Sequence, residues 1–140
     1  MKLLSDLNKK VIVITGGAGL IGKEFVKAVI ENGGIAIIAD INEQIGEEVK
    51  ENISKELNTS NIDFIKLDIT SKESLNKCLN YLDKKYTYVP DVTGMSLEDA
   101  KKTLKGFKIE LSGNGEKVFY QSPEEGTYIE EGSTVMLMLK

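Results

Sequence analysis

The sequence predicts a two-part α/β fold, in which a three-stranded parallel sheet with its crossover helices is followed by a smaller α+β region. Up to Lys85, short apolar segments alternate with amphipathic helical segments. This strand–helix order, repeated three times, favours parallel strands joined by right-handed crossovers. After Tyr86 the helical period stops, and short alternating segments separated by glycines take over. We therefore expect one domain over residues 1–86 and a second over residues 87–140.

The first strand is predicted at Val11–Ile14, an apolar run typical of a parallel strand covered on both faces. A helix from Leu20 to Asn32 follows and ends at Gly33-Gly34. Its apolar face is expected to consist of Ile21, Phe25, Ala28 and Val29, with charged residues opposite.

Two further strand–helix pairs complete the first part. The strands are predicted at Ile35–Ala39 and Ile62–Leu67. The second helix runs from about Asn42 to Leu57, with apolar residues at every fourth position: Ile45, Val49, Ile53 and Leu57. The third helix, from Ser71 to about Lys85, is preceded by a Thr70–Glu73 capping box.

The third helix carries an apolar stripe at positions i, i+3, i+4 and i+7, formed by Leu75, Cys78, Leu79 and Leu82. Cys78 is the single cysteine of the chain, so it forms no internal disulfide. A free cysteine on such a stripe is usually a buried apolar side chain, and we expect no reactive thiol here.

The tail is predicted to be a short helix with antiparallel strands. Pro90 favours an extended Val89, and Ser96 is an expected N-cap. The helix face is Leu97, Ala100 and Leu104, and the predicted strands are Phe107–Leu111, Val118–Gln121 and Val135–Leu139. A Gly113-Asn114-Gly115 turn joins the first two strands, and Ser122–Gly132 is expected to be a loop.

Composition excludes several functions. The net charge is −4 and no basic block is present, so we expect no nucleic-acid partner. All 18 basic residues are lysines and there is no histidine, so histidine-based catalysis and histidine metal sites are excluded, and no metal cofactor is expected. No apolar run reaches about 18 residues, and the N-terminus does not resemble a secretory signal. We therefore expect no membrane association and a cytoplasmic location.

A glycine-rich turn follows the first strand. Gly17-x-Gly19-x-x-Gly22 lies between a strand and a helix, as the dinucleotide-binding fingerprint requires. Such glycines allow a sharp turn, a close approach of a pyrophosphate and tight helix–strand packing. Asp40, 18 residues after Gly22, ends the second strand. Its carboxylate suits the ribose hydroxyls of NAD and would repel the 2′-phosphate of NADP.

The first part resembles the N-terminal half of the short-chain dehydrogenase/reductase family, which has a Rossmann-like fold with strand order 3-2-1 at this end. The matching segments are Thr15–Gly22, Ala39-Asp40 and Leu67-Asp68-Ile69-Thr70. The resemblance implies a cofactor site made of Gly16, Gly17, Gly19, Leu20, Ile21, Gly22, Asp40, Ile41, Asp68 and Ile69. Asp68 and Ile69 would border the adenine. Leu20 replaces a glycine of many simpler members, and the subfamily stays open between these and extended, epimerase-like members.

The catalytic region of that family is missing. The sequence lacks the fourth strand with its Asn-Asn-Ala-Gly-like turn, the catalytic serine and the Tyr-x-x-x-Lys helix. Tyr81 and Lys85 match the last pattern by letters, but they fall on the third helix, too early in the chain, so we expect no catalytic role. We therefore expect no enzyme activity and at most weak NAD binding. The alternative is an oxidoreductase completed by another chain.

Residues 88–140 resemble a PASTA repeat. The resemblance rests on Tyr88–Ala100, Gln121–Thr127 and Gly132–Val135. Such modules usually lie outside the cell and are associated with peptidoglycan or muropeptides, so a peptidoglycan fragment is a candidate ligand. The carboxylates of the tail are expected to form a solvated loop face: Glu124, Glu125, Glu130 and Glu131.

Taken together, the two resemblances predict a non-catalytic chimera, natural or engineered, of a truncated NAD-binding half and one PASTA module. In the parent sheet the first strand is central. Here Val11–Ile14 would keep one unpaired edge, which favours association. We expect a second copy of the chain, or an element of the PASTA module, to cover that edge.

Overall fold

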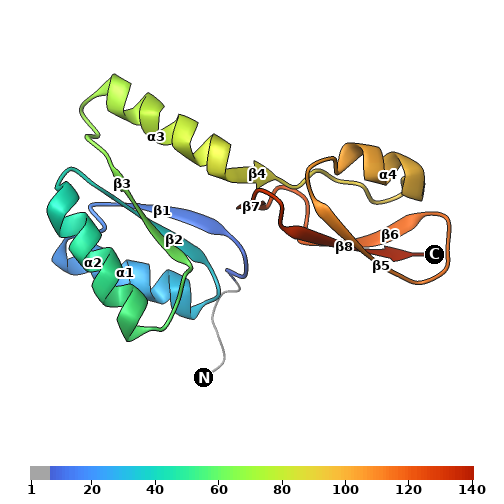
Figure 1. The fold of residues 1–140 in the computed structure, drawn as a ribbon, viewed down its shortest axis with the longest axis horizontal. Helices are drawn as coiled ribbons and strands as arrows, with labels where there is room; N and C mark the ends of the chain where they lie inside the picture. Colours follow the sequence, from blue (N-terminus) through green and yellow to red (C-terminus); the bar gives the residue numbers. More distant parts are fainter. Residues whose placement is uncertain (1–6) are drawn as a thin grey trace. The chain divides into compact units, whose positions relative to one another are not determined.

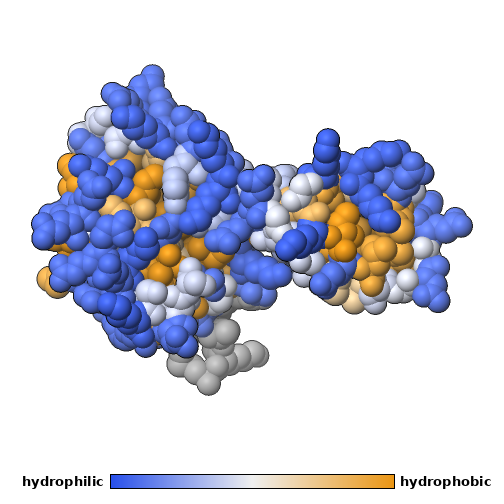
Figure 2. All heavy atoms as spheres, in the orientation of Figure 1, coloured by the Kyte–Doolittle hydropathy of each residue, from blue (hydrophilic) through white to orange (hydrophobic). Residues whose placement is uncertain are grey.

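A computed structural model of the chain describes residues 7–140. The chain divides into two compact units, Met1–Leu82 and Asp83–Lys140. Figure 1 shows the elements of each unit in chain order. The space-filling view shows apolar residues among charged ones at the surface of both units (Figure 2).

The first unit is built on a parallel sheet in the order β1-β2-β3. The strands are β1 (Val11–Thr15), β2 (Ile35–Asp40) and β3 (Ile62–Lys66). Ile14 lies opposite Ile38, and Ile38 lies opposite Phe64, so the three strands are in parallel register across the sheet. The predicted parallel sheet and the strand order 3-2-1 are confirmed.

Helices cover both faces of this sheet. They are α1 (Leu20–Glu31), α2 (Glu43–Glu56) and α3 (Lys72–Lys85). Figure 1 shows α1 and α2 on one face and α3 on the other. The main core lies under α1 and α2 and includes Val26, Ile38, Val49, Ile53 and Phe64.

The apolar face predicted for α1 is mostly wrong. The buried residues of α1 are Gly22, Val26 and Val29, whereas Ile21 and Phe25 are 74% and 60% exposed. The helix has two apolar sides, and periodicity alone did not show which of them meets the sheet. Gly22 decides this, because a glycine lets that side approach the glycine turn closely.

The expectation that β1 is covered on both faces is also wrong, since Val13 is 37% exposed. On α3, Cys78 is buried as predicted, but its stripe neighbours Leu75 and Leu79 are 40% and 58% exposed. Among residues 7–140 the sheet ends at β1, so no further strand continues it on that side.

The start of α3 corrects the predicted capping box. Ser71 is the capping residue, because its Oγ accepts a hydrogen bond from the backbone N of Ser74 at 3.2 Å. Thr70 lies one residue earlier, and its backbone N and hydroxyl donate to Asp68 at 2.9 and 2.6 Å. The nearby carboxylate of Asp68 therefore holds Thr70 in a turn and moves the cap by one residue.

The second unit contains one short helix and two small sheets. Its elements are β4 (Tyr86–Tyr88), α4 (Leu97–Thr103), β5 (Lys108–Ser112), β6 (Val118–Ser122), β7 (Tyr128–Glu130) and β8 (Thr134–Leu139). β7 lies inside the segment that was predicted to be a loop, and it pairs antiparallel with β4. The predicted N-cap is confirmed, since Ser96 Oγ accepts from the N of Asp99 at 3.1 Å.

The predicted antiparallel pairing of the tail is wrong in part. The larger sheet has the order β5-β8-β6, in which β5 is parallel and β6 antiparallel to β8. The turn between β5 and β6 does not close a hairpin, because Gly113 and Gly115 pack against the backbone of Leu139 and Lys140 at the end of β8. The central strand of this larger sheet is β8, whose buried Val135 and Leu137 contribute to the core of this unit.

Candidate functional site

The glycine turn lies between the carboxyl end of β1 and the start of α1. Gly16 has φ +66°, a conformation that side chains disfavour. A Cβ on Gly17 would lie 2.8 Å from the carbonyl oxygen of Ile14, and one on Gly22 would lie 2.7 Å from the Cα of Gly17. The helix and turn are therefore packed so closely that only glycine fits at these positions.

The N-terminus of α1 has no side-chain cap. Its N-cap residue is Gly19, and the first turn contains no acidic residue. By contrast, the N-terminus of α2 is capped by Asn42, whose side chain accepts from the N of Ile45 at 3.1 Å. An uncapped N-terminus presents N–H groups and a positive dipole end, which together favour an anion such as a phosphate.

Asp40 ends β2 beside this turn. Its Oδ2 accepts a hydrogen bond from the N of Ala18 at 3.2 Å, and its Oδ1 accepts one from the N of Asn42 at 3.1 Å. These bonds hold the carboxylate in place and use one lone pair on each oxygen. Since an ionised carboxylate has about four acceptor sites, two remain for ligand hydroxyl groups.

Asp68 follows β3 at the same edge of the sheet. The hydroxyl and the backbone N–H of Thr70 donate to its Oδ1, and both bonds lower the pKa of the Asp68 carboxyl. The backbone N of Asp68 donates to Ser74 Oγ at 2.9 Å, so this loop is fixed from both sides. Its neighbour Ile69 is 65% exposed, as is Ile41 at 61%, so both offer apolar surface to a ligand.

These loops surround a pocket of about 410 Å³. Its lining consists of Thr15, Gly16, Ala39, Asp40, Ile41, Leu67, Asp68, Ile69 and Thr70. The pocket therefore brings together five of the predicted site residues: Gly16, Asp40, Ile41, Asp68 and Ile69. The other five do not line it: Gly17 and Gly22 are buried, and Gly19, Leu20 and Ile21 are exposed.

Sequence reasoning did not assign four of the lining residues to the site. These are Thr15, Ala39, Leu67 and Thr70. Three of them end or directly follow predicted strands, and the carboxyl ends of parallel strands are where ligands of open α/β sheets bind. This position at the strand ends was the signal that could have identified them.

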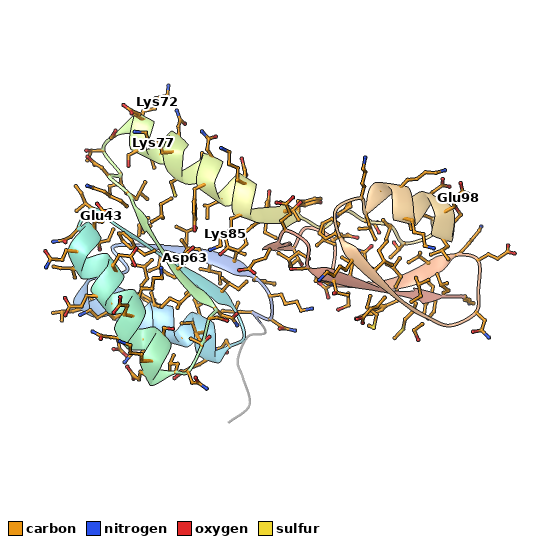
Figure 3. All side chains as sticks on the ribbon, in the orientation of Figure 1. Glu43, Asp63, Lys72, Lys77, Lys85 and Glu98 are labelled. Atoms are coloured by element: carbon orange, nitrogen blue, oxygen red, sulfur yellow. The ribbon has the colours of Figure 1, made fainter. Side chains whose placement is uncertain are left out.

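The Tyr81–Lys85 pair has other partners. The hydroxyl of Tyr81 donates to the carboxylate of Asp63, which also forms an ion pair with Lys50 at 3.2 Å. Asp63 is labelled in Figure 3, near the amino end of β3, whereas the glycine turn follows the carboxyl end of β1. Lys85 Nζ lies 5.7 Å from the centroid of the Tyr86 ring. This geometry fits a structural role for Tyr81.

The second unit has a smaller candidate site. Thr93, Phe119, Tyr120, Gln121, Glu124 and Glu125 line a hollow of about 350 Å³. Phe119 and Tyr120 are 54% and 44% exposed, so their rings are open to a ligand. Glu124 and Glu125 are exposed at the rim, as are Glu130 and Glu131 elsewhere in the unit.

Within residues 7–140, no three or more cysteine or carboxylate side chains gather in a way that could hold a metal ion. In the same range, no helix has the length and apolar character needed to cross a membrane.

Comparison with protein families identifies both parts. The short chain dehydrogenase family matches residues 10–93, and the PASTA domain matches residues 87–140. These matches confirm both resemblances found in the sequence.

Individual relatives match only part of this chain. Post-translational flagellin modification protein A of Campylobacter coli is 40% identical over 87 residues, which are 59% of this chain and 32% of that protein. Stage V sporulation protein D of Bacillus subtilis is 37% identical over 68 residues, 49% of this chain and 10% of that protein. NAD-dependent glycerol dehydrogenase of Listeria innocua is 30% identical over 81 residues, 58% of this chain and 30% of that protein. The chain thus spans a third or less of these relatives.

Solved structures agree on the fold. A putative short-chain dehydrogenase from Novosphingobium aromaticivorans has a TM-score of 0.53 at 18% identity, covering 80% of this chain and 35% of the other. A short chain dehydrogenase from Mycobacterium smegmatis has a TM-score of 0.52 at 15% identity, covering 79% of this chain and 60% of the other.

Proposed function

Since the chain belongs to the short chain dehydrogenase family through residues 10–93 and carries a PASTA domain at residues 87–140, we propose that it is a non-catalytic chimera that binds the adenosine part of NAD weakly. The observation that carries this proposal is the pocket in which the fixed carboxylate of Asp40 lies beside the glycine turn. The chain's own residues supply binding and orientation there. When bound, NAD brings the hydride chemistry, for which we assign no catalytic residue.

The residues around the pocket fit an adenosine ribose and its phosphates. The two free acceptor positions of Asp40 suit the two ribose hydroxyls, and Ile41 and Ile69 offer apolar surface to the adenine. The uncapped N-terminus of α1 suits a phosphate. Asp40 would repel a 2′-phosphate, and the sequence has no arginine to offset this. The NAD-dependent name of the Listeria relative supports the same preference.

Weak binding is expected because β1 is the last strand on its side of the sheet within residues 7–140. The nicotinamide half of the cofactor therefore has no strand ends to lie against. Each 1.4 kcal/mol of lost contact weakens binding tenfold, so we expect a Kd on the order of 0.1 to several mM.

Calorimetric and NMR titration of the full chain tests this proposal. NAD and ADP-ribose should bind alike, and NADP should bind at least about tenfold more weakly. Asp40→Asn should remove most of this discrimination, whereas Asp83→Asn makes the same charge change outside the pocket and should leave it intact. No binding at 10 mM NAD would refute the proposal.

The enzyme alternative needs its own measurement. If another chain completes the oxidoreductase, the pure protein alone should show no turnover of NADH with carbonyl substrates. Addition of a protein fraction that contains the completing chain should then give turnover. Turnover by the pure protein alone would overturn the non-catalytic assignment.

Binding of a peptidoglycan fragment is a second candidate function, supported by the hollow beside Phe119 and Tyr120. Exposed aromatic side chains with a few polar groups in a concave site are typical of ligand pockets. Such binding would place the protein outside the cytoplasm. Sedimentation with purified peptidoglycan tests it: Tyr120→Ala should reduce the bound fraction, and Leu111→Ala, another exposed apolar residue outside the hollow, should not.

A further inference from the structure

One edge of the first sheet is open at β1. Among residues 7–140, β1 pairs with β2 on one side and has no strand on the other. The segment Val11–Thr15 contains no charge and no proline, the two devices that usually protect an edge strand. Such an edge presents unpaired N–H and C=O groups to any strand that can reach it.

An apolar stripe of α1 lies beside this open edge. Lys27 of α1 forms an ion pair with Glu56 of α2 at 2.9 Å, so that side of α1 faces α2. Ile21, Phe25 and Ala28 follow one another at steps of four and three residues, and all are exposed. By helical rotation they lie on the side away from α2, next to β1, since α1 packs across β1 and β2.

We propose that the open edge and this stripe form a dimer interface, in which β1 pairs antiparallel with β1 of a second copy. The inference does not depend on NAD binding. In an antiparallel pair, opposite residues point to the same face. A twofold axis through Val13 satisfies this: Val13 lies opposite its own copy, and Ile12 lies opposite Ile14. The α1 stripes then meet on one face of a six-stranded sheet.

Apolar side chains supply part of the area that such a dimer needs. Val13, Ile21 and Phe25 are 37%, 74% and 60% exposed. Given typical side-chain areas, they offer on the order of 250 Å² per copy, or about 500 Å² for the pair. The strand backbone and the neighbouring residues add to this and bring the total towards the 1,200 Å² or more of stable interfaces.

Charge favours the antiparallel arrangement as well. Lys9 and Lys10 precede β1, and Asp40 lies at the carboxyl edge of the sheet. In the register centred on Val13, Lys10 of the second copy lies opposite Gly16, so the basic end of one copy meets the acidic edge of the other. A parallel pairing would place the lysines of both copies side by side.

Analytical ultracentrifugation of the full chain is the first test. We expect a dimer at tens of micromolar. Phe25→Glu should raise the dimer Kd at least tenfold, because two carboxylates would enter the apolar contact, while circular dichroism stays unchanged. Phe119→Glu introduces the same change at a side chain of similar exposure in the other unit and should leave the Kd unchanged. A wild-type monomer at 100 µM would overturn the proposal.

Cysteine cross-linking tests the register. With Cys78→Ser as background, Val13→Cys places two thiols opposite each other across the axis. Opposite Cα atoms in antiparallel strands are about 4.5–5.5 Å apart, within the range of a disulfide. Oxidation should give a covalent dimer. Val11→Cys is the control, since its Cα atoms would be roughly 13 Å apart and should not cross-link. Cross-linking of Val11→Cys in preference to Val13→Cys would refute this register.

Discussion

Replacement of Gln121 by leucine tests how the PASTA unit is held together. Gln121 is 4% exposed and lies on β6. Its Oε1 accepts from the backbone N of Val92 at 2.8 Å, and its Nε2 donates to the carbonyl oxygens of Pro90 and Pro123 at 3.0 and 3.4 Å. One amide thus joins β6 to the segment before α4 and to the loop after β6.

The expected loss of stability follows from these bonds. Leucine has a similar volume but no polar atom, so the Val92 N–H loses its acceptor inside the core. An unsatisfied buried donor costs about 1–3 kcal/mol, and each lost net hydrogen bond costs about 0.5–1.5 kcal/mol. Burial of the apolar leucine side chain offsets part of this loss of stability. We therefore expect Gln121→Leu to destabilise the second unit by about 2–4 kcal/mol.

Urea denaturation of the full chain, followed with two probes, can measure this loss. Four of the five tyrosines, at positions 86, 88, 120 and 128, lie in the second unit, so tyrosine fluorescence reports mainly on that unit. Most of the helix lies in α1, α2 and α3, so circular dichroism at 222 nm reports mainly on the first. Gln121→Leu should lower the fluorescence midpoint and leave the dichroism midpoint nearly unchanged.

A second variant separates the two halves of the amide. Gln121→Glu keeps an acceptor for Val92 but loses the donor to the two proline carbonyls, so it should also destabilise the unit. If Gln121→Leu cost less than about 0.5 kcal/mol, the hydrogen bonds of Gln121 would not be what holds these segments together, and the reasoning would fail.

Three further predictions concern the first unit. Gly22→Ala should destabilise it by about 1–2 kcal/mol in urea, because overpacking against the backbone of Gly16 outweighs the better helix propensity of alanine. Native Cys78 should react with a thiol reagent far more slowly than after unfolding, because burial raises its pKa and blocks access; fast native labelling would contradict this. Thr70→Val should raise the pKa of Asp68 in an NMR titration, since the hydroxyl that lowers it is gone. In the wild type, ionised Asp68 favours the folded state above its ordinary pKa of 3.8, and that contribution is lost as the pH falls through the lower folded value.

Much of the fold could be predicted because its signals are local. The alternation of apolar strands and amphipathic helices fixed the parallel sheet, and Gly16–Gly22 marked the turn that leads into α1. Half of the predicted cofactor residues line the pocket, since they stand at the ends of adjacent parallel strands. Chain order alone brings those ends together.

Strand pairing in the tail and the capping residue of the third helix could not be predicted from local patterns in this way. In the tail, alternation indicated strands but not neighbours, and β8 took the central place between β5 and β6. At the third helix, the Asp68 carboxylate held Thr70 and moved the cap to Ser71. In both cases a group outside the local pattern competed for the same backbone or side-chain atoms.

The sequence by itself determined the two families and the fold class, and it indicated the residues proposed to bind NAD. Only the tertiary structure decided which side of α1 is buried: Gly22, Val26 and Val29 meet the sheet, and Phe25 is left exposed beside the open β1 edge. The physical reason is that a helical period shows which residues share a side, whereas burial depends on what packs against that side. On this chain a sheet lies on one side of α1, and on the other no strand continues the sheet within residues 7–140.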